Sequence, residues 1–142
     1  MTSQRDLRFD VVIPAHNAAS TITEAVLSVL SQRLPPRTVT VVADRCTDDT
    51  ARRAAAAGAS VIVSERGTPG GARNVGTEIG SADWIACLDA DDIWRPSWLE
   101  SVAATVARGP AVDVCFGTVE VVDATGASIS GPLIHGPFGK AK

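Results

Sequence analysis

Residues 84–94 read Trp-Ile-Ala-Cys-Leu-Asp-Ala-Asp-Asp-Ile-Trp, and this stretch decides how the rest of the chain is interpreted. The apolar run Trp84–Leu88 has the length of a strand and ends at three carboxylates, Asp89, Asp91 and Asp92. Such a strand end commonly holds a divalent cation, because Mg²⁺ and Mn²⁺ prefer oxygen ligands and share them with substrate phosphates. A short Asp-x-Asp is also compatible with a solvated acidic turn before a helix, so the surrounding chain has to decide.

The rest of the chain alternates between short apolar runs and segments of helical periodicity. This order predicts an α/β fold, a doubly wound and mainly parallel sheet flanked by helices. We expect strands at Phe9–Ile13, Val39–Ala43, Ser60–Ser64 and Trp84–Leu88, and helices at Thr21–Gln32, Thr47–Gly58, Ala72–Gly80 and Pro96–Arg108. Pro14 should end the first strand, and capping boxes at Thr21/Glu24 and Ser97/Glu100 should start two helices.

The chain beyond Pro110 has a different pattern. Residues 111–116 and 118–122 are expected as strands, residues 123–126 as a turn, and residues 127–134 as a returning hairpin strand. The length of 142 residues suits one domain, so we expect residues 1–142 to form a single unit.

Composition excludes several classes of protein. The net charge is −3 and there is no Tyr, which argues against a nucleic-acid footprint or an aromatic stacking platform. Three cysteines without a C-x-x-C pair argue against a disulfide framework or structural zinc, and favour a reducing cytosol. The polar N-terminus lacks a signal-peptide pattern, and no run reaches the ~18–20 apolar residues of a membrane helix.

Polar segments follow each of the first four expected strands, at Pro14–Asn17, Asp44–Arg45, Arg66–Asn74 and Asp89–Asp92. In open α/β sheets, ligands bind at the carboxyl ends of the strands where the winding reverses. If the strand order is 3-2-1-4, the first and fourth strands are neighbours and their loops face one crevice. This convergence favours a binding site over a solvated turn.

The residues of this crevice suit a ligand that carries phosphate. Asp89 and Asp91 would point the same way, with Ala90 opposite, and could hold a metal ion and a ribose hydroxyl. Arg73, near a helix N-terminus, could pair with a diphosphate, or it could form a surface ion pair with a nearby Asp. Asp44 could accept a hydrogen bond from a base N–H, or it could bond its own backbone in a turn.

At these positions the sequence resembles the family-two glycosyltransferases over about its first hundred residues. The resemblance rests on five motifs in order: Val12–Asn17, Thr21–Gln32, Val42–Thr50, Gly71–Gly76 and Leu88–Pro96. It implies a GT-A fold. This chain would hold the nucleotide-sugar-binding half of that fold, up to and including the Asp-x-Asp, and would be incomplete after it. It also implies inverting transfer of a sugar, expected to be UDP-linked, to an acceptor hydroxyl with Mn²⁺ or Mg²⁺.

The resemblance also assigns residues. It implies that Pro14 and Ala15 line the nucleoside pocket, that Asp44 contacts the base, and that Arg73 lies near the diphosphate. The ribose would lie near Asp89 and Ala90, and the metal would be held by Asp91 with Asp89 as a weaker companion. Asp92 is assigned to the structure of the turn.

Two positions depart from the family pattern. The family often has Asp-Asp-Gly-Ser where this chain has Ala43-Asp-Arg-Cys46, and often has Tyr where this chain has His16. We interpret His16 as a packed loop residue. Trp94 and Trp98 could stack on an acceptor sugar, but we favour an anchoring role beside the last helix.

The catalytic base of the family lies well downstream of the Asp-x-Asp, and its position here is unknown. Glu120 and Asp123 lie downstream, but neither stands in a matching motif. His135 as a further metal ligand is disfavoured by its Gly/Pro-rich surroundings.

Other functions remain open at this point. The principal alternative is a truncated nucleotide-sugar-binding or interaction module without turnover. A phosphatase of the haloacid dehalogenase type would carry its Asp-x-Asp on the first strand, and a dinucleotide oxidoreductase would need Gly-x-Gly-x-x-Gly there. The expected partners are a nucleotide-sugar donor, a glycan, lipid or small-molecule acceptor, and a C-terminal half, with a cytoplasmic location that could include the inner face of the membrane.

Overall fold

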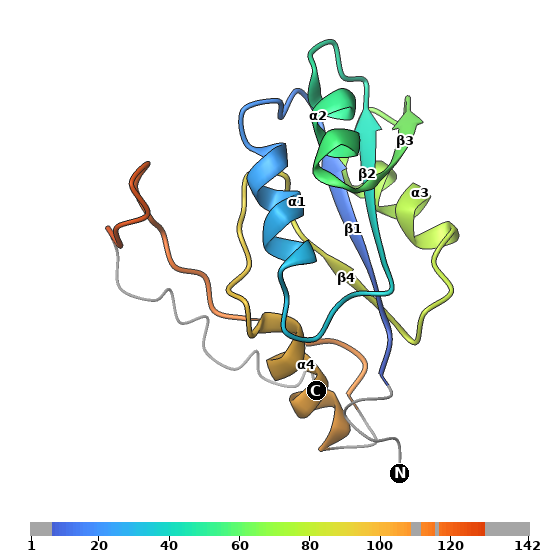
Figure 1. The fold of residues 1–142 in the computed structure, drawn as a ribbon. Coiled ribbons are helices and arrows are strands. Elements are labelled where there is room, and N and C mark those ends of the chain that lie inside the picture. The colour runs from blue at the N-terminus through green and yellow to red at the C-terminus, as the bar shows by residue number, and fades with distance from the viewer. Residues whose placement is uncertain (1–6, 109–111, 116, 130–142) are drawn as a thin grey trace, which may run out of the picture. The chain divides into compact units, whose positions relative to one another are not determined.

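The computed structural model describes residues 7–108, 112–115 and 117–129. The chain divides into two compact units, Met1–Pro110 and Ala111–Lys142. All the helices and strands of the described residues belong to the first unit (Figure 1). In chain order they are β1 (Phe9–Ala15), α1 (Ile22–Leu30), β2 (Thr38–Asp44), α2 (Thr50–Ala57), β3 (Ser60–Ser64), α3 (Pro69–Glu78), β4 (Trp84–Cys87) and α4 (Trp98–Ala107).

The four strands form one parallel sheet in the order β3-β2-β1-β4. This is the order on which the expected convergence of the loops depended. Helices α1 and α2 pack together and against β2 and β3, whereas α3 packs on β1 and β2 from the other face of the sheet (Figure 1). The winding therefore reverses between β1 and β4, as right-handed crossovers require.

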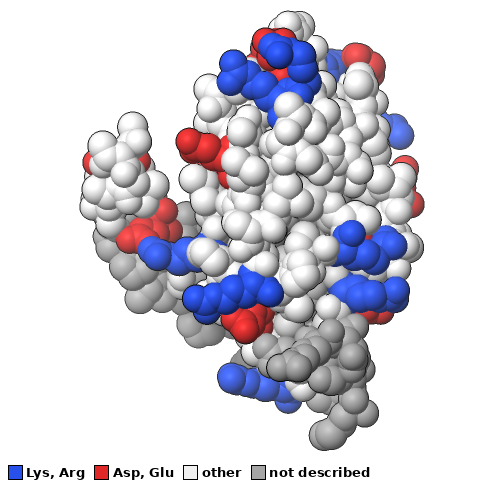
Figure 2. All heavy atoms as spheres, in the orientation of Figure 1, with Lys and Arg blue, Asp and Glu red and all other residues white. Residues whose placement is uncertain are grey.

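The sheet is covered on both faces, which explains why its central strands are mostly apolar. Every residue of β1 is buried, and on the α3 face Val12 and Val42 pack against Ala72. Figure 2 shows that the outer surface over α1 and α2 is mostly uncharged, with Lys, Arg, Asp and Glu gathered at its ends. Among the described helices, none has both the length and the apolar character needed to cross a bilayer.

The expected end of the first strand at Ile13 is wrong, because β1 continues through Pro14 to Ala15, where both residues pair with β2. In a strand, the backbone N–H and C=O groups of every second residue point toward the same neighbouring strand. The backbone nitrogen of Pro14 therefore points toward β4, as that of Val12 does. Strand β4 ends at Cys87, opposite Val12, and only Leu88 N–H extends the ladder, by donating to Val12 O. The missing N–H of Pro14 therefore costs no sheet hydrogen bond.

The expected capping boxes are only half present. Thr21 and Ser97 do occupy the N-cap positions of α1 and α4, but neither side chain makes a cap hydrogen bond. Helix α2 begins at Thr50 instead of near Thr47, and α3 begins at Pro69 instead of Ala72. At α3 the cap is Thr68, whose hydroxyl accepts the Gly71 N–H at 3.0 Å.

Helix α4 is fixed beside the end of α1 by a buried glutamine. The Gln32 side chain donates to Arg95 O at 2.8 Å and accepts the Leu99 N–H at 2.9 Å. Trp94, which is buried, stacks on Trp98 with ring centroids 4.2 Å apart. These contacts support the anchoring role of the two tryptophans.

The second unit forms a turn but not the expected sheet. Within its described residues the ladder is reduced to isolated bridges, such as the antiparallel one between Val122 and Ser128, so strands at 112–115 and 118–122 are wrong. The expected turn is present, with Asp123 O accepting the Gly126 N–H at 2.9 Å. A two-stranded hairpin by itself is marginal, which explains a turn without extended arms. The rest of the expected hairpin, from residue 130 on, lies outside the described residues.

Candidate functional site

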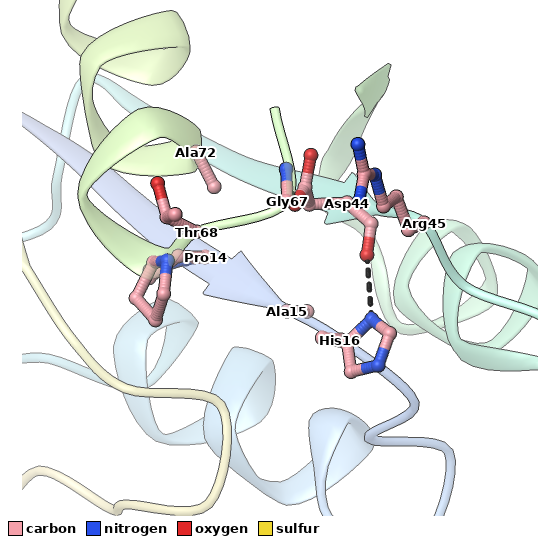
Figure 3. A pocket seen from close by; sticks show the side chains of 9 residues that line it. Pro14, Ala15, His16, Asp44, Arg45, Gly67, Thr68 and Ala72 are labelled. Atoms are coloured by element: carbon pink, nitrogen blue, oxygen red, sulfur yellow. Dashed lines mark hydrogen bonds between the residues drawn. The ribbon is translucent and has the colours of Figure 1, made fainter. Parts of the chain in front are cut away.

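A pocket of about 360 Å³ opens at the carboxyl ends of β1 and β2, beside the first turn of α3 (Figure 3). Its volume falls within the range of small-molecule sites. Its lining comes from three segments far apart in sequence: Pro14, Ala15, His16, Asp44, Arg45, Gly67, Thr68, Pro69 and Ala72. The structure therefore brings together three of the residues expected from sequence, namely Pro14, Ala15 and Asp44.

Asp44 holds one wall of this pocket in place through hydrogen bonds. Its carboxylate is 5% exposed, and its two oxygens accept the backbone N–H groups of Arg66 and Gly67, each at 2.7 Å. Burial raises the pKa of Asp44, but hydrogen bonds from the Ser64 hydroxyl and from these two backbone groups outweigh it, and the pKa lies below its usual value. A charged Asp44 thus holds the loop between β3 and α3, over 22 residues away, instead of bonding its own turn.

His16 is a member of the site that the sequence interpretation missed. The side chain is exposed and lines the pocket, so its interpretation as a packed loop residue is wrong. Its Nδ1 lies 2.9 Å from the Asp44 carbonyl oxygen, which can only accept, so Nδ1 carries the proton (Figure 3). Its position in the sequence could have indicated this role, because His16 comes two residues after Pro14, at the end of a central strand.

Arg45 and Gly67 were also missed, and both adopt left-handed backbone conformations, with φ of +50° and +75°. A residue other than glycine rarely takes this conformation, which explains why the family often has glycine at the position of Arg45. The Arg45 N–H donates to Ser64 O at 2.9 Å, which joins the ends of β2 and β3. The departure from the family pattern at Arg45 could have indicated that this residue belongs to the site.

Arg73 forms an ion pair with Asp89, in which its Nη2 donates to Oδ1. The ion pair with a nearby Asp that was one of two interpretations of Arg73 is therefore present. It joins α3 to the turn after β4, with the two side chains 36% and 54% exposed. Neither residue is in the lining of the pocket, but Arg73 directly follows the lining residue Ala72.

The acidic turn lies beyond this ion pair. Asp89, Asp91 and Asp92 are exposed while Ala90 is buried, and the turn closes through the Asp92 N–H and Asp89 O at 3.1 Å. Burial, followed by the charges of Asp91 and Asp89, raises the pKa of Asp92, so the three carboxylates are close enough to repel one another. Ala90 and Asp91 do not line the pocket.

We tested whether this turn suits a metal ion. In the part of the chain that the structure describes, no three His, Cys, Asp or Glu side chains are placed to hold one. Asp91 makes no hydrogen bond or ion pair with any described residue, so its two oxygens remain available. A carboxylate-only donor set with few protein ligands fits Mg²⁺ or Mn²⁺, which complete their shells with water and phosphate oxygens.

Asp123 organises its own turn by accepting the Thr125 and Ala127 N–H groups at 2.8 and 3.0 Å. The Thr125 hydroxyl and these backbone bonds lower its pKa, which weakens it as a base. His135 lies outside the described residues.

Comparison with known proteins gives a consistent result. The family model for glycosyl transferase family 2 matches residues 10–136. Succinoglycan biosynthesis protein ExoO of Rhizobium meliloti (strain 1021) is 34% identical over 83% of this chain and 35% of its own length. UDP-Glc:alpha-D-GlcNAc-diphosphoundecaprenol beta-1,3-glucosyltransferase WfgD of Escherichia coli is 28% identical over 83% of this chain and 48% of its own length. The chain thus spans about a third to a half of the length of these relatives.

A solved structure shares the fold as well. The glucosyl-3-phosphoglycerate synthase of Mycobacterium tuberculosis, in complex with Mn²⁺, UDP and phosphoglyceric acid, superposes with a TM-score of 0.62 at 26% identity. It covers 75% of this chain and 41% of the synthase chain. Together with the parallel sheet and its pocket, these matches show a GT-A fold, and the chain belongs to glycosyl transferase family 2.

Proposed function

We propose that this pocket binds the nucleoside of a nucleotide-diphosphate sugar, with uridine as that nucleoside, and that the protein transfers the sugar to an acceptor hydroxyl with inversion. The observation that carries the proposal is the arrangement at one sheet edge. The pocket has the size of a nucleoside, and Asp44 holds one of its loops by hydrogen bonds. The ion pair of Arg73 and Asp89 comes next along this edge, and then Asp91, whose carboxylate bonds no described residue. The synthase complex with UDP and Mn²⁺ supports the same class of ligand.

In this proposal each part of the donor meets its own residues. Pro14, Ala15 and the loop held by Asp44 enclose the base and ribose. Arg73 turns from Asp89 to the diphosphate, because a guanidinium pairs with phosphate oxygens through two parallel hydrogen bonds. Asp89, released from that pair, and the neighbouring Ala90 backbone lie beside the ribose.

Asp91, with Asp89 as its companion, is proposed to hold Mn²⁺ or Mg²⁺. The ion would neutralise the charge that grows on the leaving diphosphate. The side chain of Asp91 is suited to this position because it is exposed and makes no competing bond to a described residue. The acceptor is proposed to be a glycan, a lipid-linked sugar or a small molecule. The name of WfgD includes a diphosphoundecaprenol, which supports a lipid-linked acceptor.

The binding proposal is tested by calorimetry with UDP, GDP and dTDP, with and without Mn²⁺. We expect metal-dependent binding of a nucleoside diphosphate, and a loss of at least tenfold in affinity in Asp91→Ala, since removing a metal ligand removes a direct charge contact. Glu78→Ala, at the far end of α3, is the matched control for the loss of one exposed carboxylate. Equal affinities of the wild type and Asp91→Ala would contradict the metal assignment.

Arg73 has its own test, based on two ligands that differ only in phosphate. Arg73→Met should weaken UDP binding roughly tenfold and leave uridine binding unchanged, because a hydrogen bond to a charged group contributes about 1.5–3 kcal/mol. A parallel loss for both ligands would instead indicate that Arg73 acts through the shape of α3.

The alternative is binding without turnover, and a specific observation favours it. Asp123, a described carboxylate downstream of the acidic turn, is occupied in its own turn, where its hydrogen bonds lower its pKa and weaken it as a base. Release of UDP from a UDP-sugar in the presence of candidate acceptors distinguishes the two functions. Steady multiple turnover by this chain would exclude the binding-only alternative.

A further inference from the structure

Arg45 occupies the pocket wall in a way that the proposed function does not yet use. It directly follows Asp44, at the carboxyl end of β2, and its left-handed backbone turns the side chain toward the loop between β3 and α3 (Figure 3). A Cβ atom built on Gly67 would lie 2.7 Å from both Cζ and Nη1 of Arg45. The guanidinium therefore lies directly against Gly67.

The donors of this guanidinium are available to a ligand. Its Nε lies 3.7 Å from Glu65, an ion pair between side chains that are 58% and 80% exposed. No described residue accepts a hydrogen bond from it within 3.5 Å. Contact with Gly67 positions the group at the pocket while its N–H groups stay unused.

Asp44, the carboxylate at this end of the pocket, is already engaged. Each of its oxygens accepts a backbone N–H at 2.7 Å, and the residue is buried. The guanidinium of Arg45 is a cationic group of the wall with several donors to spare and no acceptor. It can bond a carbonyl oxygen of a base, but it is mismatched with an amino group, which also only donates.

We propose that Arg45 is a specificity-determining residue of the donor pocket, and that its guanidinium donates to a carbonyl oxygen of the nucleobase. It would thereby favour bases with a carbonyl oxygen at C4 of a pyrimidine or C6 of a purine, such as uracil and hypoxanthine, over cytosine and adenine, which carry an amino group at that position. This inference rests on the proposed binding of a nucleoside diphosphate in the same pocket.

The test compares matched ligands that exchange a keto group for an amino group at one ring position: UDP with CDP, and IDP with ADP, each with Mn²⁺ in calorimetry. The variant Arg45→Met keeps an unbranched side chain of similar length, so the left-handed backbone is no more strained than before, while all donors are lost. The control is Arg52→Met, which removes an exposed arginine of α2 that pairs with Asp49 outside the pocket. Circular dichroism checks that each variant is folded.

We expect the wild type and Arg52→Met to prefer the keto base, and the keto-to-amino affinity ratio to fall roughly tenfold in Arg45→Met, since a charge-assisted hydrogen bond is lost. An unchanged ratio, including a uniform weakening of all four ligands, would overturn the inference and leave the proposed function intact. Failure of the wild type to bind any of the four would overturn both. Should Arg45→Met not fold, Arg45→Gln, which keeps two donors and no charge, should still lower the ratio severalfold, and an unchanged ratio there would likewise contradict the role of Arg45.

Discussion

Among single residues, Asp10 makes the largest set of polar contacts away from the pocket. It is 2% exposed in the middle of an apolar strand, and it accepts two hydrogen bonds from Arg37, at 2.9 and 2.7 Å. The Thr38 hydroxyl donates at 2.7 Å, and the N–H groups of Ser81 and Ala82 donate at 2.8 and 2.9 Å. One carboxylate thus joins β1 to the segments that lead into β2 and β4.

These bonds make Asp10 a charged group in a buried position. Burial raises its pKa, but the hydrogen bonds from Arg37, Thr38, Ser81 and Ala82 outweigh it, so the pKa lies well below the usual range. Because the native pKa is lower than the unfolded value of about 3.9, the ionised form stabilises the fold above about pH 4. That contribution is lost as the pH falls from there toward the native pKa.

Asp10→Asn should therefore lower the free energy of unfolding by about 2–4 kcal/mol at pH 7, because it breaks a buried charge pair and leaves buried donors poorly matched. Urea unfolding followed by circular dichroism measures this loss. The difference between wild type and variant should shrink as the pH is lowered from 6 to 3. Glu78→Gln controls for the general loss of one negative charge, and a difference that stays constant with pH would contradict the role of an ionised Asp10.

At the scale of elements, α3 is the helix that builds one wall of the pocket. Its cap and first turn supply Thr68, Pro69 and Ala72, and its close approach to the sheet depends on Gly76. A Cβ built on Gly76 would lie 2.3 Å from Cγ1 of Val12. Since β1 is a fully buried central strand, Val12 cannot yield, and α3 would have to move.

Gly76→Ala should accordingly destabilise the protein by about 1–3 kcal/mol and weaken nucleotide binding, even though alanine is the better helix former. The matched control lies on the same helix. A Cβ built on Gly70 meets nothing within 4 Å, so Gly70→Ala should be neutral or slightly stabilising. Equal urea midpoints for the two variants would show that the contact with Val12 is not what requires glycine.

For the molecule as a whole, the decisive feature is the reversal of winding between β1 and β4. The order β3-β2-β1-β4 places the ends of β1 and β2 next to the turn after β4, and α3 crosses behind them (Figure 1). The proposed donor would bind across loops that unfolding separates. Its binding should therefore stabilise the fold as a unit.

Thermal unfolding with UDP and Mn²⁺ at about one hundred times the dissociation constant should reveal about 2.7 kcal/mol of stabilisation, a rise of several degrees in Tm. Removal of the metal with a chelator should abolish most of the rise, because the diphosphate then lacks its cation. A rise of the same size with Mn²⁺ alone would mean that the ion binds elsewhere. Uridine should give a smaller shift than UDP.

Much of the fold follows from sequence because its signals are local. The apolar runs of β1 to β4, the helical periodicity of α1 and the glycine after α2 placed every element of the first unit, with errors of a few residues at their ends. The pocket residues Pro14, Ala15 and Asp44 followed from the motifs that carry the family resemblance. Strands in the second unit were overpredicted, since β-branched runs form strands only where a partner strand is present.

The sequence by itself determined the order of strands and helices, the parallel sheet and the carboxylates at its edge, because these depend on periodicity and on short motifs. Only the tertiary structure decided what each polar group bonds. Asp44 holds backbone groups 22 and 23 residues away, Arg73 pairs with Asp89 16 residues on, and Asp10 reaches Ser81 across 71 residues. Such partners are chosen by the packing of distant segments, which no local pattern records. For that reason the sequence identified the acidic turn of residues 89–92, but not the pocket wall of His16, Arg45 and Gly67 beside it.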